Sequence, residues 1–406
     1  MSREQPSSIA ITNALVVEPE RVIEGGSVGI RDGFIVEVCD AERPRDDYES
    51  VIDANGAYVM PGIIDLHNDS LEVEINPRPE TNLSIDFALA NLERRLLFSG
   101  VTTEFHAIAF MNRASGRRTS QGAAERSAFL AERSAAGRGL IDNQVLHRLD
   151  VWSPDSLDLI FESLERLQVR YVSINDHTPG QGQYRDLDGF KQRMAAWAER
   201  RGGVADAAAE MERRINERAS DSETVPSVYQ RVVTERERLG FTIASHDDDS
   251  PEKVEALHEL GARITEFPVD VPSARKAREL GMTIVVGAPN IVRGGSSSGN
   301  QSAVELFELG LADVICADYH APSLLVSAFA LADDGVTSLT AAMAALTCNA
   351  GRAVGLDDRG AIEPGRRADL ILVRRQGRGL PAVERMFCGG IERLSLRSPE
   401  TVGARA

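Results

Sequence analysis

Lysine is scarce in this sequence: Lys191, Lys253 and Lys276 are the only three among 406 residues, so arginine carries nearly all of the positive charge. Asp and Glu total 62 against 45 Lys and Arg, which leaves a net charge of −17. An acidic, Lys-poor composition is associated with adaptation to high salt, although GC-rich coding alone also favours arginine over lysine. The charge argues against nucleic acid as a partner, because phosphate backbones require basic surfaces. It leaves room for a small phosphorylated substrate in a locally basic pocket.

The sequence also has few cysteines and no long apolar run. Its four cysteines lie far apart in the chain, without a CxxC spacing: Cys39, Cys316, Cys348 and Cys388. This spacing is more typical of reduced thiols in the cytosol than of a disulfide framework or a thiolate metal site. No stretch of about 20 apolar residues could span a membrane, and the first residues, MSREQPSSIAI, do not resemble a secretory signal. We therefore expect a cytoplasmic protein with no membrane partner, and homo-oligomerisation stays open.

Short β-forming segments cluster at both ends of the chain. Residues 8–53 contain IAITNALVV, GSVGI and FIVEVC, separated by Gly-containing turns. Residues 359–373 and 383–394 show the same pattern near the other end. Together they predict one small β-sandwich domain built from residues 1–58 and 358–406, with two independent β-rich caps as the alternative.

The middle of the chain, residues 59–357, alternates apolar runs with helical stretches, as repeated βα units do. Eight such runs occur: YVMPGIIDL, GVTTEFHAI, VLHRLDVW, VRYVSIN, GFTIAS, ARITEFP, MTIVVGAP and LADVICA. Eight repeats over about 280 residues match the usual size of a (β/α)8 TIM barrel, an α/β fold. A doubly wound open sheet is the alternative, but no GxGxxG opens a helix after the first strand.

Residues 187–239 are longer than one barrel helix and are rich in Ala, Glu and Arg. They predict two or three amphipathic helices inserted after the fourth strand. Such an insertion is either an ordinary exposed helical excursion or a lid over the site.

Polar residues follow most of the apolar runs, at the strand ends where barrel enzymes carry their catalytic groups. The candidate metal ligands at these ends are His67, Asp69, His177, His246 and Asp318. Further candidates beside them are Asp176, Asp247 and Glu266. Three of the seven histidines lie just past apolar strands, which favours a metal site over coincidence.

His67 and Asp69 form a His-x-Asp pair whose side chains share one face, because a strand has a period of two. Such a pair can hold one divalent ion, and imidazole with carboxylate suits zinc, manganese or iron rather than calcium. A hydrogen-bonded strand terminus is the alternative explanation. We expect a divalent transition metal, zinc first and manganese second, as one or two ions.

Asp318 follows the eighth run, where a carboxylate can contact the metal and also accept a proton from water. A bound metal ion lowers the pKa of water toward about 7, which makes hydroxide available at neutral pH. We therefore expect Asp318 to be catalytic, with an N-cap for the helix after Ser323 as the alternative. His320 lies two residues further on and is a candidate for contact with the substrate.

Residues 287–300, GAPNIVRGGSSSGN, follow the seventh run and surround one arginine with Gly, Ser and Asn. Backbone N–H groups in a Gly-rich turn can bind anionic oxygens, and barrels often bind phosphate after strands seven and eight. An arginine adds a planar guanidinium that suits phosphate. The expected substrate-binding residues are Asn290, Arg293, Gly294, Gly295 and, in NPRPE, Arg78. A flexible loop and, for NPRPE, a rigid Pro-flanked loop are the alternatives.

Taken together, these segments resemble the α-D-ribose 1-methylphosphonate 5-triphosphate diphosphatases of the carbon–phosphorus lyase pathway, a family of the amidohydrolase superfamily. The resemblance is carried by PGIIDLHND, NPRP, GVTT, DHTPGQ, ASHDD, EFP, GAPNIVRGG, SGN, ADY and RGAIEPGRRADLILV. It implies a metal-bearing barrel with a small β-sandwich. It also implies hydrolysis of a ribose 1-alkylphosphonate 5-triphosphate to the 5-phosphate and pyrophosphate.

Several positions depart from the family pattern. Ser153 and Pro154 stand where the family has Cys-Glu, which leaves the number of metal ions open, and Glu80 replaces a usual basic residue. Glu266 takes the sixth-strand position of a superfamily histidine, unless the strand count is off by one. An amidohydrolase acting on a cyclic amide or an N-acyl amino acid is the alternative function, and a non-enzymatic barrel scaffold is a third.

Overall fold

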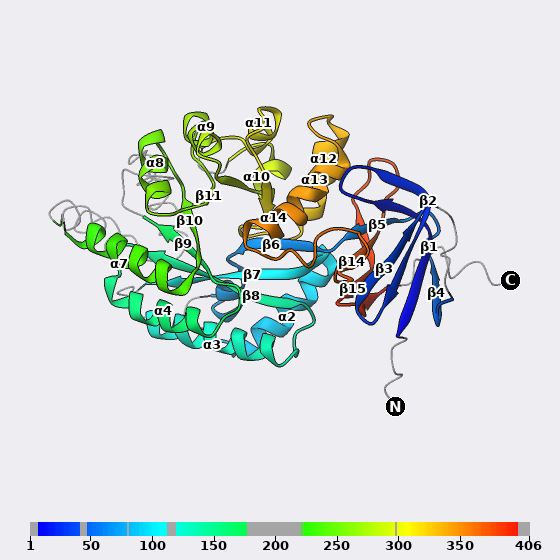
Figure 1. Cartoon of the computed structure of the whole chain (residues 1–406), viewed down its shortest axis with the longest axis horizontal. Helices are drawn as coiled ribbons and strands as arrows, with labels where there is room; N and C mark the ends of the chain where they lie inside the picture. Colours follow the sequence, from blue (N-terminus) through cyan, green and yellow to red (C-terminus); the bar gives the residue numbers. More distant parts are fainter. Residues whose placement is uncertain are drawn as a thin grey trace.

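The chain forms a barrel of parallel strands surrounded by helices, with a small domain built on a second β-sheet beside it (Figure 1). The computed structural model describes residues 7–40, 47–78, 81–111, 119–176, 221, 223–296 and 299–396. The prediction of a TIM barrel with a small β domain from both termini is confirmed. Within these residues, no helix is both long and apolar enough to cross a bilayer.

Eight parallel strands form the barrel, and each pairs with its neighbours in chain order. They are β6 (Ile63–Asn68), β7 (Val101–Phe110), β8 (Asp142–Asp150), β9 (Tyr171–Asn175), β10 (Thr242–His246), β11 (Ile264–Glu266), β12 (Thr283–Gly287) and β13 (Val314–Cys316). Each of the eight predicted runs supplies one of these strands. Glu266 therefore does end the sixth barrel strand, and the strand count is correct.

The ends of the last and first barrel strands are joined by backbone hydrogen bonds. The N–H of Asp318 donates to the carbonyl of His67 at 2.8 Å, and the N–H of Asp69 donates to the carbonyl of Asp318 at 2.8 Å. Asn68 and Asp318 form the corresponding parallel bridge. This closure places the residue after the eighth strand against the His-x-Asp pair of the first.

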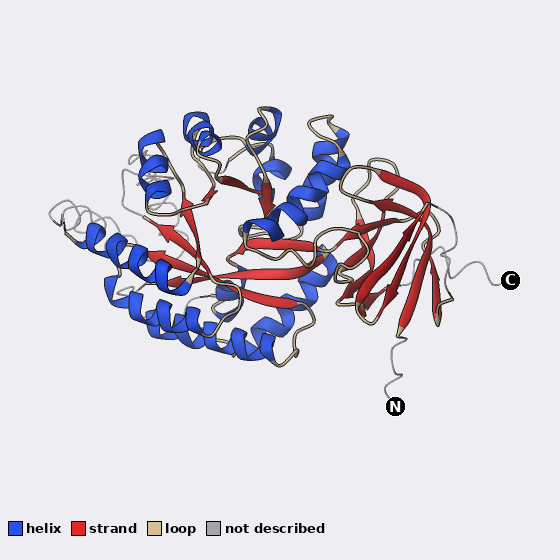
Figure 2. Cartoon of the chain, viewed as in Figure 1, coloured by secondary structure: helices blue, strands red, loops and turns tan. Residues whose placement is uncertain are grey.

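Helices cover the outside of the barrel (Figure 2). They are α1 (Ser70–Ile75), α2 (Ile85–Ser99), α3 (Ser120–Ala135), a 3-10 turn (Pro154–Ser156), α4 (Leu157–Glu165), α7 (Thr224–Leu239), α8 (Pro251–Glu259), α9 (Val271–Glu279), α10 (Ala288–Arg293), α11 (Ala303–Glu308), α12 (Ser323–Asp333), α13 (Leu339–Leu346) and α14 (Cys348–Ala353). Polar caps start several of them: Ser250 and Asp270 accept from backbone N–H groups in the first turns of α8 and α9. Of the predicted insertion, residues 187–220 and 222 lie outside the described residues, and its end forms α7.

The apolar residues of the barrel strands pack on two sides. One set fills the barrel interior and includes Leu66, Phe105, Leu146 and Ala244. The other set packs against the helices and includes Ile108, Val145 and Ile243. Strands that are buried on both faces have near-continuous apolar sequences, which is why the eight runs could be recognised.

The small sheet combines segments from both ends of the chain. Its strands are β1 (Ser8–Val17), β2 (Val22–Arg31), β3 (Phe34–Cys39), β4 (Ser50–Asp53), β5 (Tyr58–Pro61), β14 (Leu370–Arg374), β15 (Ala382–Cys388) and β16 (Ile391–Ser395). Strand β5 pairs with β1 on one side and with β14 on the other. This pairing joins the two termini in one sheet and excludes the alternative of two independent caps.

The first predicted run, residues 58–66, is two strands rather than one. Its first half, β5, belongs to the small sheet, and its second half, β6, belongs to the barrel. Gly62 lies between them, where an added Cβ would come within 2.3 Å of the Thr102 side chain. Only a residue without a side chain allows this close approach, and the chain passes here from one sheet to the other.

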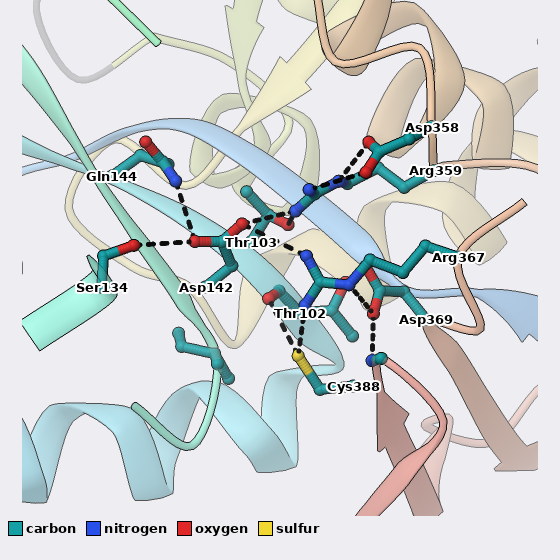
Figure 3. Close-up of polar contacts among 12 residues, drawn as sticks. Thr102, Thr103, Ser134, Asp142, Gln144, Asp358, Arg359, Arg367, Asp369 and Cys388 are labelled. Atoms are coloured by element: carbon teal, nitrogen blue, oxygen red, sulfur yellow. Dashed lines mark hydrogen bonds and ion pairs between the residues drawn. The ribbon is translucent and has the colours of Figure 1, made fainter. Parts of the chain in front are cut away.

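A buried ionic cluster holds the C-terminal segment against the start of β8 (Figure 3). Arg359 Nη1 lies 2.5 Å from Asp142 Oδ2, and Arg367 Nη1 lies 3.3 Å from the same oxygen. Arg367 also pairs with Asp369 at 3.2 Å. Burial raises the pKa of Asp142, but the two guanidinium groups outweigh this effect and hold that pKa below its ordinary value. Asp142 therefore stays charged between two arginines.

Replacing Asp142 with alanine should destabilise the protein strongly, because two largely buried guanidinium groups lose a shared carboxylate. We expect the free energy of unfolding to fall by about 3 kcal/mol, measured by urea denaturation. The matched control is Glu165→Ala, which breaks a half-exposed pair with Arg238; its cost should stay below about 1 kcal/mol. Equal losses in both variants would contradict this role of the cluster.

Candidate metal centre

Four polar side chains from different barrel strands meet around His67. The ligand atoms of His67, His246 and Glu266 lie within 4.8 Å of one another, and so do those of His67, Asp69 and Asp318. The His67 side chain is 1% exposed and belongs to both groups. Of the predicted metal ligands, the structure brings together His67, Asp69, His246 and Asp318; His177 lies outside the described residues.

The backbone is strained at three of the strand ends that form this site. Asp247, Phe267 and Asp318 follow β10, β11 and β13 directly, and all three have left-handed conformations with φ of 53°, 57° and 57°. Such conformations cost energy for residues other than glycine and are concentrated at functional sites. At each position the N–H still bonds to the neighbouring strand, so the turn is sharp without breaking the barrel.

Phe267 fixes the two imidazole rings of the site. Its ring packs edge-on against His67, with ring centres 5.3 Å apart, and against His246 at 5.2 Å. Sequence reasoning did not find this residue, because it looked for donor atoms rather than for the apolar side chains that orient them. The available signal was its position in EFP, directly after Glu266.

Glu266 orients His67 rather than facing the cavity. Its Oε1 lies 3.2 Å from His67 Nδ1 and accepts a hydrogen bond from Tyr171 at 3.0 Å. Its Oε2 accepts from Ser173 at 2.6 Å. A carboxylate that holds Nδ1–H fixes the ring tautomer and leaves Nε2 to bind a metal. Both Glu266 oxygens are thus occupied by protein donors, and His67 Nε2 is directed toward Asp69, 3.8 Å away.

The carboxylates of the site attract positive charge. Burial disfavours a charged His67, but Glu266 and Asp69 outweigh this effect and raise the pKa of the imidazole to about 10. Burial raises the pKa of Asp318 to about 6. One or two imidazoles with two carboxylates form a donor set that suits zinc or manganese. The residues present therefore fit a divalent transition metal.

Arg148 is a charged residue of the site that sequence reasoning missed. It lies within β8 and donates Nη1–H to Asp69 Oδ1 at 2.7 Å. The guanidinium lowers the pKa of Asp69 well below its ordinary value, against the opposing effect of burial. Strand ends predict only residues that follow the apolar runs, whereas Arg148 lies inside the run VLHRLDVW.

A cavity of about 290 Å3 opens beside these residues. Its lining includes, from the barrel strands and their ends, Asp69, Arg148, His246, Asp247 and Asp318 and, from helix α10 after β12, Asn290 and Arg293. Arg293 is exposed and ends α10. Gly294 and Gly295 follow it with φ of 74° and 152°, which lets the loop turn immediately. The predicted anion-binding segment thus shares one cavity with three of the predicted metal ligands, Asp69, His246 and Asp318.

Asn290 braces the loop rather than offering its amide to the cavity. Its Nδ2 donates to the carbonyl of Gln301 at 3.0 Å, and its Oδ1 accepts from the N–H of Ala303 at 3.0 Å. Both ends of the side chain are therefore bound to protein. Asn290 positions the loop that carries Arg293.

The other predicted site residues have partners elsewhere and are not among the described residues that line the cavity. Arg78 donates to Thr81 at 3.1 Å. Asp176 accepts from Trp152 at 3.2 Å, and His320 Nδ1 lies 2.7 Å from Ser323 Oγ. Asp318 is not the N-cap of α12, because that position is Pro322.

Comparison with known proteins gives one strong sequence relative and many structural ones. No protein-family model matches the chain. The chain is 30% identical over 368 residues to the α-D-ribose 1-methylphosphonate 5-triphosphate diphosphatase of Escherichia coli K12, covering 90% of this chain and 95% of that protein. Similar solved structures share the fold at lower identity. Molinate hydrolase has a TM-score of 0.63 at 16% identity, covering 96% of this chain and 95% of that one. An amidohydrolase has a TM-score of 0.60 at 18% identity, covering 96% and 100%.

Replacing Glu266 with glutamine should weaken metal binding without abolishing it, because Glu266 positions a ligand. We expect one equivalent of Zn²⁺ to bind about 10–100-fold more weakly in calorimetric titration. His67→Asn, which removes a donor atom, should lose the site. If Glu266→Gln binds no metal while His67→Asn still does, the roles of these two residues are reversed.

Proposed function

Since this chain belongs to the α-D-ribose 1-methylphosphonate 5-triphosphate diphosphatase family of the amidohydrolase superfamily, we propose that it hydrolyses a ribose 1-alkylphosphonate 5-triphosphate. The products are the corresponding 5-phosphate and pyrophosphate. The observation that carries the proposal is the relative that matches over nearly the full length of both chains. The shared cavity of metal-ligand candidates and Arg293 supports it.

The residues that would hold a divalent zinc or manganese ion are His67, Asp69 and Asp318, with His246 as a further candidate beside His67. When bound, such an ion polarises phosphoryl oxygens and lowers the pKa of water. Glu266 and Phe267 keep the imidazole rings in place for this role. The chain's own groups perform the remaining tasks, which are proton transfer and the binding of the phosphates.

Asp318 is positioned to act as the general base. In the proposed step, a water oxygen bonds to the α-phosphorus while its proton passes to the Asp318 carboxylate. The bond from the α-phosphorus to the bridging oxygen breaks, and its electron pair leaves with pyrophosphate. Burial raises the pKa of Asp318 to about 6, closer to neutrality than that of an ordinary aspartate, which makes it a stronger base.

The polyphosphate requires cations in a cavity that carboxylates otherwise dominate. Arg293 lies at the cavity edge, on a loop that Asn290 braces from within the protein. Its guanidinium can contact two phosphate oxygens at once. Fixed cations stabilise the charge that spreads over phosphoryl oxygens during the transfer. We assign Arg293 to the β- or γ-phosphate of the substrate.

Purified protein supplied with zinc or manganese should release pyrophosphate from ribose 1-methylphosphonate 5-triphosphate. A coupled pyrophosphate assay measures the rate, and phosphorus NMR identifies the products. A panel of cyclic amides and N-acyl amino acids serves as the comparison. Turnover of an amide without any release of pyrophosphate would overturn the proposal in favour of an amidase.

Asp318→Asn should lower kcat by about 10²- to 10⁴-fold, because the amide cannot accept the proton. The fold should survive, since the closing bonds at Asp318 come from the backbone. Circular dichroism checks the fold. Asp334→Asn, at an exposed ion pair, is the control and should keep full activity. Full activity in Asp318→Asn would remove this residue from the mechanism.

A further inference from the structure

Arg148 is a buried cation in the wall of the cavity. Its side chain is 12% exposed, and it lines the cavity together with Asp69 and Asp318. Its Nε and Nη2 both donate to Asn175 Oδ1, at 3.3 Å and 3.0 Å. Asn175 is itself fixed by a bond to the Ser173 carbonyl at 2.8 Å. The guanidinium is therefore held in one orientation from two sides.

The surroundings of Arg148 are strongly acidic. Besides Asp69, the carboxylates of Glu266 and Asp247 lie close enough to stabilise its charge. Burial disfavours that charge, but these carboxylates outweigh it and raise the pKa of Arg148 above its ordinary value. An arginine is charged at every physiological pH in any case. The site thus contains a permanent positive charge that no metal ion has to supply.

Asp69 contacts a cation and also lies beside the other metal-ligand candidates. Its Oδ1 lies 2.7 Å from Arg148 Nη1 and 3.8 Å from His67 Nε2. In two-metal hydrolases the paired ions are about 3.5–4 Å apart and clamp the attacking and leaving oxygens together. Here Asp69 Oδ1, the oxygen that lies beside His67, already accepts a hydrogen bond from a guanidinium. A second ion at this position would have to displace Arg148 or be repelled by it.

We propose that Arg148 is the second cation of the site and that the chain uses one metal ion. The proposal deepens the proposed function and rests on it for the identity of the substrate. Within the described residues, three of the five guanidinium N–H groups donate to Asp69 and Asn175. The two remaining N–H groups, one on each terminal nitrogen, belong to a side chain that lines the cavity. They bind an oxygen of the phosphoryl group under attack.

Metal content is the first test, because it does not depend on any substrate. The wild-type protein, titrated with Co²⁺ and followed by its visible absorption and by elemental analysis, should bind one equivalent. Arg148→Ala should bind a second, weaker equivalent, since the carboxylates that surrounded the guanidinium remain. Two equivalents in the wild type, or one in both proteins with unchanged affinity, would overturn the proposal.

Kinetics and chemical rescue form the second test. Arg148→Ala should lower kcat for pyrophosphate release by about 10²-fold. Millimolar guanidinium chloride, far below denaturing concentrations, should restore part of the rate and raise the Tm of this variant. Arg148→Lys keeps the charge and should lose less activity than Arg148→Ala. Arg148→Lys also serves as the test if the alanine variant does not fold. A lysine variant that keeps the wild-type rate and binds two metal ions would contradict the assignment.

Arg133→Met is the matched control for both tests. Arg133 also pairs with a buried carboxylate, Glu93, at 3.3 Å, but between α3 and α2, outside the cavity. The Arg133→Met variant should be less stable than the wild type, but it should still bind one metal ion and keep full turnover. Added guanidinium should not change its rate. A guanidinium response in this control would show that the rescue is not specific to Arg148. If the wild type releases no pyrophosphate, the proposed substrate is wrong, whereas the metal count still decides whether Arg148 is the second cation.

Discussion

The site depends on the closure of the barrel between its last and first strands. Two backbone hydrogen bonds join Asp318 to His67 and Asp69, which are far apart in the sequence. These bonds bring the eighth-strand carboxylate beside the first-strand imidazole, and the left-handed conformation of Asp318 keeps it there. If the barrel opened at this seam, the donor atoms would separate. The fold and the chemistry therefore share one structural element, and the strain at the strand ends is offset by the packing of the barrel.

Charge balance explains most of the other features of the site. Carboxylates converge on His67, and two of them, Glu266 and Asp69, outweigh the effect of burial and raise the pKa of this imidazole to about 10. Arg148 offsets part of this negative charge, and a divalent ion would offset more. A polyanionic substrate can enter only if the positive charge at the site exceeds the negative charge of the local carboxylates. The whole chain carries a net charge of −17, so the proposed anionic substrate would have to be attracted by local rather than overall charge.

Sequence patterns predicted the barrel because its strands are buried on both faces and their apolar runs are easily counted. The metal-ligand candidates were predictable for a similar reason: His67, His246 and Asp318 lie at or just past strand ends, where a barrel places its functional groups. Arg148 was not predictable, since its role depends on which strands are neighbours: its partners are Asn175 on the adjacent strand and Asp69 after a strand two positions away. The split at Gly62 was missed because two strands of different sheets form one continuous apolar run. Local patterns reveal burial, whereas pairing between distant residues requires the fold.

The central claim is that side chains from separate strands hold one cation at the seam of the barrel. Anomalous diffraction at the absorption edge of the bound metal tests it most directly, in crystals of protein purified without chelators. The account predicts an anomalous peak about 2.0–2.2 Å from His67 Nε2 and from a carboxylate oxygen of Asp318. A metal-loaded crystal with no peak at this position, or with its peak bound to other residues, would contradict the account.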